Sequence, residues 1–344
     1  MDALLEIDGS FGEGGGQILR MAVALSAVTG REVVVRNIRA KRERPGLAPQ
    51  HLAAVAAVAT VCGARVEGLA PRSRQVRIAP GTISGGGYRF DVGTAGSVAL
   101  VLQALLPLWI ASGHAAAVTV TGGTDVPHAP PFDYFQNVLL PLLARLGVEV
   151  RIQGIRRGYY PRGGGEVRLT VAPGSLEPLV LDERGAILAI EGRAHVSSIP
   201  EHIATRMRDA ALERCPQARV EVEVVDAARA AGPGGAIVVW ARTGATVLGA
   251  GRVAERGVRA ETLGAAVGEE LAADLSAGAT LDRHAADQML VYLALAKGGS
   301  FLTRSITTHA RTAMWLLSQF FAVRFDVSSK GELVRVSVAP GAPS

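Results

Sequence analysis

The sequence predicts an α/β protein whose larger part is built from three βαβαββ repeats, with a smaller α/β domain inserted into the third repeat. Glycines that end expected helices recur at a constant spacing: Gly113 follows Gly30 by 83 positions, and Gly147 follows Gly63 by 84. A strand ending of the form hydrophobic-Ala-Pro-Gly occurs three times, at residues 78–81, 171–174 and 338–341. Self-similarity with a period of roughly 80 to 90 residues indicates repeated supersecondary units.

Each repeat is expected to contain two helices and four strands, with a glycine cap closing several of the helices. The first strand is expected within residues 1–7, which also carry two acidic residues and so do not form a secretory leader. The expected helices span residues 15–29 and 50–62, 96–112 and 133–146, and 284–297 and 308–321. The clearest further strands are 32–36 and 115–121.

The third repeat is longer than the others by the size of a small domain, so the insertion is placed at residues 184–278. The large repeat domain then comprises residues 1–183 and 279–344. Within the insertion, apolar periodicity predicts helices at 200–214 and 259–275 and strands at 187–196, 219–225, 236–241 and 246–252. Few convergent polar groups occur there, which favours a scaffolding or substrate-guiding role.

The composition is that of a globular protein, and its modest basic excess suits an anionic ligand, although many soluble proteins share this excess. Hydrophobic residues make up 49% of the chain, charged residues 19%, and the formal net charge is +5. Cys62 and Cys215 are the only cysteines, too few for a disulfide framework or a cysteine metal cluster, which fits a reducing cytoplasm. The longest apolar run, 98–111, is shorter than the roughly 20 residues of a membrane span, so no membrane association is expected.

The segment 303–311 contains the strongest candidate for chemistry. Thr307 and Thr308 are alternative N-caps for the following helix, and either places His309 in its first turn. A helix start attracts anions and disfavours a charged imidazole. His309 is therefore a candidate nucleophile toward phosphorus, with an incidental surface histidine as the alternative.

A glycine-rich turn at residues 9–17 precedes the first helix. Its glycines allow backbone N–H groups to approach a phosphate closely, and Arg20 follows one turn into the helix. Glu13 places a carboxylate in the same turn, where it can hold a divalent cation such as Mg²⁺ or Mn²⁺. A flexible turn whose Glu13 only complements the helix dipole is the simpler alternative.

A basic loop at residues 39–51 indicates contact with a polyanion. The residues expected to contact the phosphates of such a polyanion are Arg20, Arg39, Arg42, Gln50 and His51. A solvated charge cluster is the competing interpretation of this loop.

A nucleotide pocket is expected where the repeats meet, because their helix starts converge if the repeats pack around one axis. The expected lining is Gln103, Pro131, Phe135, His284, Ala285, Ala286, Asp287 and Gln288. Gln103 lies in an otherwise apolar helix and needs a hydrogen-bond partner, either a ligand or a group within the fold.

The stretch 157–167, Arg-Gly-Tyr-Tyr-Pro-Arg-Gly-Gly-Gly-Glu-Val, resembles the signature of the RNA 3'-terminal phosphate cyclases. Further matching segments are 12–20, 38–51, 122–131 and 286–288, together with His309. The resemblance implies ATP and a divalent metal as cofactors and an RNA with a 3'-phosphate end as the partner. It also implies that His309 carries AMP through Nε2, passes it to the RNA 3'-phosphate, and leaves a 2',3'-cyclic phosphate.

Two other classes share parts of this pattern. A cyclase-like branch lacks the nucleophilic histidine, so His309 argues against it. Enolpyruvyl transferases use two domains of similar repeats, for which this chain is too short. His284 departs from the family, where an aromatic Tyr is expected in some relatives, and Glu43 is an extra acidic residue in the basic loop.

Overall fold

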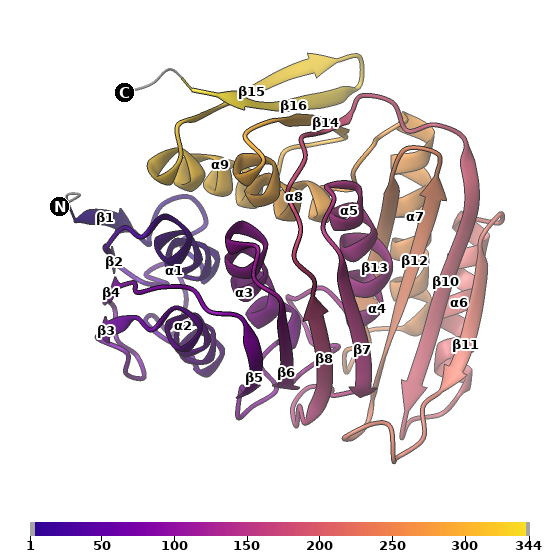
Figure 1. The fold of residues 1–344 in the computed structure, drawn as a ribbon. Helices are drawn as coiled ribbons and strands as arrows, with labels where there is room; N and C mark the ends of the chain where they lie inside the picture. The colour runs from indigo at the N-terminus through magenta and orange to yellow at the C-terminus, as the bar shows by residue number, and fades with distance from the viewer. Residues whose placement is uncertain (1–3, 342–344) are drawn as a thin grey trace.

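The computed structural model describes residues 4–341 and shows three repeats with one shared topology (Figure 1). The first repeat comprises β1 (Leu5–Asp8), α1 (Gln17–Thr29), β2 (Val33–Arg36), α2 (Pro49–Cys62), β3 (Arg65–Glu67) and β4 (Val76–Ala79). The second comprises β5 (Gly86–Asp91), α3 (Val98–Ser112), β6 (Ala116–Gly122), α4 (Phe132–Tyr134), η1 (Phe135–Leu139), α5 (Leu140–Arg145), β7 (Val150–Arg156) and β8 (Gly165–Val171). The third comprises β9 (Leu179–Leu181), α8 (Arg283–Leu295), β14 (Gly299–Thr303), α9 (Thr308–Phe320), β15 (Val323–Lys330) and β16 (Leu333–Pro340).

The three repeat sheets have equivalent strand orders. These are β1-β2-β4-β3, β5-β6-β8-β7 and β9-β14-β16-β15. In each sheet the first two strands are parallel and the other pairs antiparallel. Parallel neighbours need a crossover, which α1 and α3 supply in the first two repeats. The predicted α/β fold with three repeats is thus confirmed.

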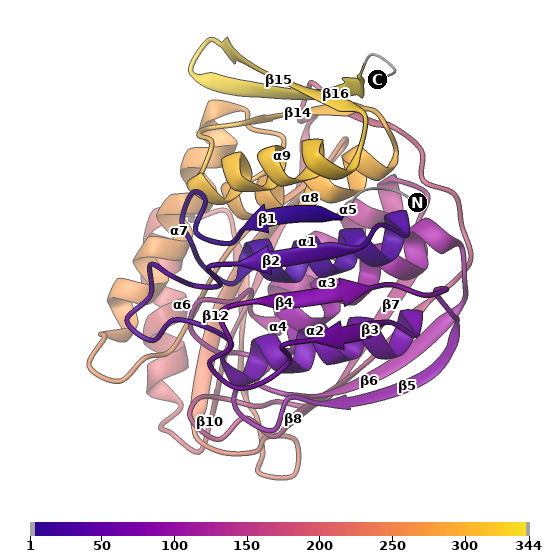
Figure 2. The ribbon, with the colours of Figure 1, turned by 90° about the vertical axis from the view of Figure 1, so that its left-hand side faces the viewer.

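The sheets cover the outside of the large part, and the helices lie between them (Figures 1 and 2). Helix α1 packs against α2, α3 and α9, and α8 packs against α9. This arrangement buries the apolar helix faces in one continuous core. It also brings the starts of helices from different repeats close to one another.

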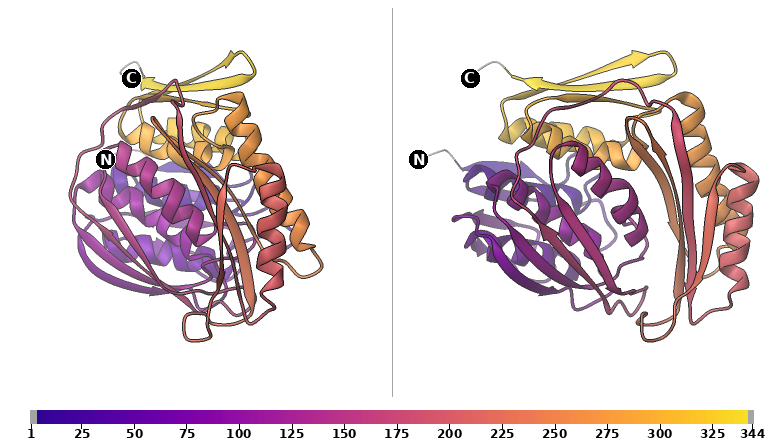
Figure 3. Two further views of the ribbon diagram at one scale, coloured as in Figure 1. Left: turned by 90° about the vertical axis from the view of Figure 1, so that its right-hand side faces the viewer. Right: turned by 45° about the vertical axis from the view of Figure 1, so that its right-hand side comes forward.

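The inserted segment, which lies between β9 and α8 in the sequence, forms its own four-stranded sheet. Its elements are β10 (Ile187–Ser197), α6 (His202–Arg214), β11 (Arg219–Val224), β12 (Gly234–Thr243), β13 (Val247–Val253) and α7 (Ala260–Ala277). The strand order is β11-β10-β12-β13, and α6 and α7 cover the outer face of this sheet (Figure 3). A second apolar core lies between the sheet and these helices. We propose that residues 184–278 form a small domain, as the boundaries predict.

The predicted helix at 133–146 is divided by a π-helical turn. The N–H of Leu140 donates to the carbonyl of Phe135, five residues earlier. Pro141 follows immediately and has no N–H to continue the regular α-helical pattern. The helix therefore widens before it resumes as α5.

Within residues 4–341, no helix has both the length and the apolar character needed to cross a bilayer.

Candidate functional site

The start of α9 presents His309 at the surface. Thr307 is the N-cap: its hydroxyl accepts a hydrogen bond from the N–H of Ala310 at 2.9 Å. This observation decides between the two threonines that the sequence offered. The His309 side chain is 48% exposed, which leaves the imidazole accessible to a substrate.

Gln17 fixes the orientation of the His309 ring from the first residue of α1. The Gln17 Nε2 amide donates to the backbone carbonyl of His309 at 3.2 Å, so its Oε1 atom is the acceptor 2.7 Å from His309 Nδ1. An amide oxygen only accepts, so Nδ1 carries a proton. In the neutral ring the lone pair is therefore on Nε2.

Glu13 lies on the other side of the ring. Its Oε2 atom is 2.8 Å from His309 Nε2, and its Oε1 atom pairs with Arg42. Oε2 is buried and makes no hydrogen bond of good geometry to any of the described residues. The glycine-rich turn thus supplies two side chains, those of Glu13 and Gln17, and both contact His309. Gln17 was not predicted as a site residue, although it ends the turn that the sequence singled out.

Basic and neutral groups surround the start of α1. Burial lowers the pKa of Arg20 to about 10, and no acidic group among residues 4–341 pairs with it. Burial, with the charges of Arg20 and Arg39, lowers the pKa of His51 to about 3, so its imidazole is neutral. Gly16 lies against the His51 ring, where a side chain would collide with Nε2.

No side chain within the described part of the chain caps the start of α1. Its free N–H groups and Arg20 make an anion-binding environment.

Arg39 and Gln50, the other predicted phosphate-contacting residues of the loop at 39–51, have neighbours within the fold. Arg39 has a positive φ of 53° and donates to the carbonyls of Arg44 and Gly46, both at 2.9 Å. These bonds hold the basic loop together rather than aim Arg39 at His309. Gln50 lies beside Gly96, in the turn before α3.

Asp287 joins α8 to the cap of α9. The Thr307 hydroxyl donates to Asp287 Oδ1 at 2.6 Å while it accepts from Ala310. Burial, and less strongly the negative charges of Asp282 and Glu13, raise the pKa of Asp287 to about 7. The carboxylates of Glu13 and Asp287, from different repeats, are therefore close enough for the charge of Glu13 to raise the pKa of Asp287.

Gln103 finds its partner within the fold. Its Nε2 atom donates to Gln288 Oε1 at 2.5 Å, and Gln288 Nε2 donates to the carbonyl of His284 at 3.1 Å. The side chain of His284 is 45% exposed, and burial with nearby Arg283 and Arg252 lowers its pKa to about 4 despite the opposing effect of Glu270. These contacts join α3 to the start of α8.

The remaining predicted pocket residues are packed. Phe135 is 1% exposed, Ala285 0% and Ala286 1%, all within the main core. Pro131 is buried and packs near Gly251 of β13. Their predicted contact with a nucleotide stays a prediction.

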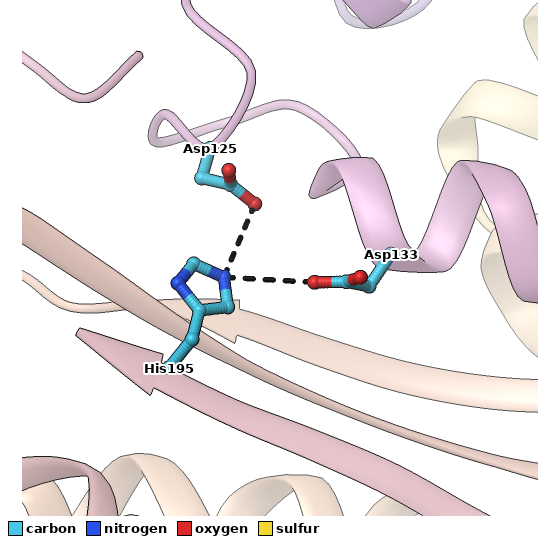
Figure 4. Close-up of side chains that lie close together, drawn as sticks. All are labelled: Asp125, Asp133 and His195. Carbon is cyan, nitrogen blue, oxygen red and sulfur yellow. Dashed lines mark ion pairs between the residues drawn. The ribbon is translucent and has the colours of Figure 1, made fainter. Parts of the chain in front are cut away.

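A second polar cluster, which the sequence did not reveal, joins the second repeat to the inserted sheet (Figure 4). His195 Nε2 lies 3.7 Å from Asp125 Oδ1 and 3.6 Å from Asp133 Oδ2, and all three side chains are fully buried. Arg157 pairs with both carboxylates at 3.1 and 2.7 Å, and Arg193 pairs with Asp133 at 3.2 Å. Two guanidinium groups balance two carboxylates, which makes this cluster a structural ion-pair network.

A cleft lies next to that network, and His309 is not among its lining residues. It has a volume of about 300 Å³, and Phe132, Arg157 and Arg193 are among its lining residues. The candidate site is therefore defined by its chemistry and not by the depth of a pocket.

A divalent cation fits the residues at the start of α1 and α9. Glu13 Oε2 is a buried carboxylate oxygen without a well-formed hydrogen bond, and Asp287, whose pKa is raised mainly by burial and in part by the charge of Glu13, supplies a second carboxylate nearby. Mg²⁺ commonly takes one or two protein carboxylates and completes its shell with water and phosphate oxygens.

Fold and site together define a three-repeat α/β protein with an exposed histidine, His309, held by Gln17 beside an uncapped helix start. The family model of the RNA 3'-terminal phosphate cyclases matches residues 11–327. The chain belongs to this family and is therefore an enzyme.

Curated relatives match over nearly their whole length. A protein named RNA 3'-terminal phosphate cyclase from Nitrosospira multiformis is 52% identical over 340 residues, which cover 97% of this chain and 96% of the relative. Relatives of the same name from Archaeoglobus fulgidus and Pyrococcus furiosus are 43% and 41% identical, over 94% and 96% of this chain and 98% of each relative. The suspected family resemblance is confirmed.

Proposed function

We propose that this protein uses ATP to convert the 3'-terminal phosphate of RNA into a 2',3'-cyclic phosphate through an AMP bound to His309. The proposal rests on one arrangement: Gln17 keeps the proton on Nδ1 of His309, which leaves Nε2 as the nucleophile. The cyclase-like branch, which lacks this histidine, is disfavoured by the same arrangement.

In the first step the Nε2 lone pair attacks the α-phosphorus of ATP, the bond to the bridging oxygen breaks, and pyrophosphate leaves. A proton on Nε2 must be lost before attack, and Glu13 Oε2 at 2.8 Å is the group placed to accept it. Nδ1 keeps its proton throughout through Gln17.

In the second step an oxygen of the RNA 3'-phosphate attacks the phosphorus of the histidine-bound AMP, and the bond to Nε2 breaks. In the third step the neighbouring 2'-hydroxyl attacks the RNA phosphorus and expels AMP. The sequence of steps replaces a poor leaving group by AMP, which is the advantage of covalent catalysis.

Positive groups offset the negative charge that accumulates in these steps. Arg20 and the free N–H groups of α1 would face phosphate oxygens, and the neutral His51 would add a hydrogen bond there. Arg39 and Arg42 would hold the basic loop along the RNA. A divalent metal held by Glu13 would stabilise charge on the phosphate oxygens when bound. His284, Gln288 and Gln103 would line the adenosine side, with Pro131 and Asp287 supporting it.

The test is incubation with ATP, Mg²⁺ and a short RNA that ends in a 3'-phosphate. The wild type should make the terminal phosphate resistant to phosphatase, and His309→Ala should not. His114→Ala, which changes an exposed histidine distant from His309 in the sequence, is the matched control and should stay active.

A second substrate separates the steps. An RNA whose terminal nucleotide lacks the 2'-hydroxyl cannot cyclise, so it should accumulate with AMP on its 3'-phosphate. Cyclisation by His309→Ala at the wild-type rate, or the absence of any AMP-capped product on this substrate, would overturn the proposed route.

A further inference from the structure

An exposed aromatic pair lies beside the candidate site. Phe11 of the glycine-rich turn stacks on Trp315 of α9, with ring centroids 3.9 Å apart and an interplanar angle of 17°. Phe11 is nevertheless 41% exposed. The indole covers one face of the phenyl ring, and the exposed surface leaves the ring available to a second planar partner.

The pair is held in a defined position relative to His309, because the turn that carries Phe11 lies along α9. Glu13 and Gln17 contact His309, at the start of the helix. Gly12, with a φ of +56°, lies against Thr312, one turn further along, and leaves no room for a side chain. Trp315 is six residues from His309, which corresponds to about 9 Å along the helix axis.

This position separates the aromatic pair from the proposed adenosine pocket. The α8 residues of that pocket meet α9 at its first residues, through the bond between Asp287 and Thr307. The pair lies on the opposite side of His309 along the helix. The adenine of ATP is therefore not the ligand that its position favours.

Positive charge borders the same surface. Lys41 Nζ donates to the carbonyl of Gly12, next to Phe11, at 2.8 Å, and Arg42 pairs with Glu13. Lys41 and Arg42 are both exposed. Aromatic side chains beside a basic strip are the combination that binds single-stranded nucleic acid, since bases stack on the rings while cations contact the backbone.

We propose that Phe11, backed by Trp315, is a stacking platform for a base close to the 3' end of the RNA, separate from the nucleotide pocket. The proposal rests on the proposed function, because that function brings an RNA end to His309. It assigns the platform to the RNA alone, so the reaction of the protein with ATP by itself should not depend on it.

The test compares Phe11→Leu, which keeps an apolar side chain but loses the planar ring, with Phe11→Tyr, which keeps the ring. Loss of one stacked base typically reduces affinity by about tenfold. Phe11→Leu should therefore raise Kd and KM for a short 3'-phosphorylated RNA by about tenfold, and Phe11→Tyr should remain near wild type. Self-adenylylation with ATP alone should be unchanged in both. Leu188→Ala, which truncates an exposed apolar residue of the inserted sheet, is the control.

Abasic RNAs locate the stacked base. For the wild type, removal of one base near the 3' end should raise Kd by a similar factor. For that abasic RNA, Phe11→Leu should raise Kd little further, because the base that would stack on the ring is already missing. If Phe11 served only to pack against Trp315, Phe11→Leu would have a lower Tm and would lose the same factor in affinity for normal and abasic RNA. That result would overturn the platform.

Binding is measured by the anisotropy of a fluorescent RNA without ATP, so the result does not depend on turnover. RNA binding that depends on Phe11, without any cyclisation by the wild type, would refute the proposed function and leave the platform standing. Cyclisation with RNA binding that is indifferent to Phe11 would refute the platform alone.

Discussion

Gln17 and His309 are 292 residues apart in sequence and are joined by two hydrogen bonds in the fold. One bond runs from the Gln17 amide to the backbone carbonyl of His309, and the other joins Gln17 Oε1 to Nδ1 of the ring. The backbone bond sets the amide orientation, and the amide orientation sets the tautomer. A residue of the first repeat thereby determines which ring nitrogen of the third repeat can react.

Replacement of Gln17 by Met tests this relationship, because Met has a similar size and cannot accept the Nδ1 proton in the same way. Loss of such an orienting partner commonly costs 10- to 100-fold, so self-adenylylation should slow by about that factor. Gln319→Met changes an exposed glutamine further along α9 and should have no effect. A Gln17→Met protein that adenylylates at the wild-type rate would show that the tautomer is set elsewhere.

Glu13 is expected to take part in both the ion pair with His309 and cation binding. Glu13→Gln keeps the shape of the side chain and removes its charge. The concentration of Mg²⁺ that gives half-maximal self-adenylylation should rise by about tenfold or more, since a charged oxygen ligand is lost. Glu43→Gln, on the exposed basic loop, is the control. An unchanged Mg²⁺ titration for Glu13→Gln would contradict the assignment.

Asp287 should make stability depend on pH. Its pKa of about 7 in the folded protein exceeds the ordinary value of 3.8, so the unfolded chain loses this proton first as pH rises. Asp287 therefore lowers the free energy of unfolding between about pH 4 and pH 7, and the loss levels off above that range.

Asp287→Asn cannot ionise and can still accept from Thr307 through its amide oxygen. Relative to the wild type, its Tm should be similar near pH 4 and higher by pH 8. Asp326→Asn, at an exposed position on β15, should show no such trend. A constant difference between Asp287→Asn and the wild type over this range would mean that Asp287 titrates near its ordinary value.

The buried network of Asp125, Asp133 and His195 is expected to be stable without a metal, because Arg157 and Arg193 already balance its carboxylates. Asp133→Asn leaves Arg157 short of a buried partner and should lower the free energy of unfolding by about 3–5 kcal/mol. A chelator should not change the Tm of the wild type. A Tm that falls with chelator and recovers with Zn²⁺ or Mn²⁺ would instead identify a metal site.

The fold could be predicted further than the site. Repeated glycine caps and strand endings are local signals, and they are enough to predict the three repeats from the sequence. The division of the helix at 133–146 was missed, because a π turn depends on how α4 packs as well as on Pro141.

The sequence offers candidate site residues one at a time and does not show which of them are in contact. His309 and Glu13 lie in distinctive local sequence, whereas the role of Gln17 depends on a contact across 292 residues. His195 gave no signal, because a single histidine in an alternating strand does not indicate which carboxylates will face it. Gln103 needed a partner, but only the structure shows that the partner is Gln288.

The most direct test of the account is to incubate the protein with ATP and Mg²⁺ in the absence of RNA and to locate AMP by mass spectrometry of its peptides. We expect AMP on Nε2 of His309, in a linkage that is cleaved by acid and survives alkali, and none in His309→Asn. AMP on any other residue, or on no residue while RNA ends are still cyclised, would contradict it.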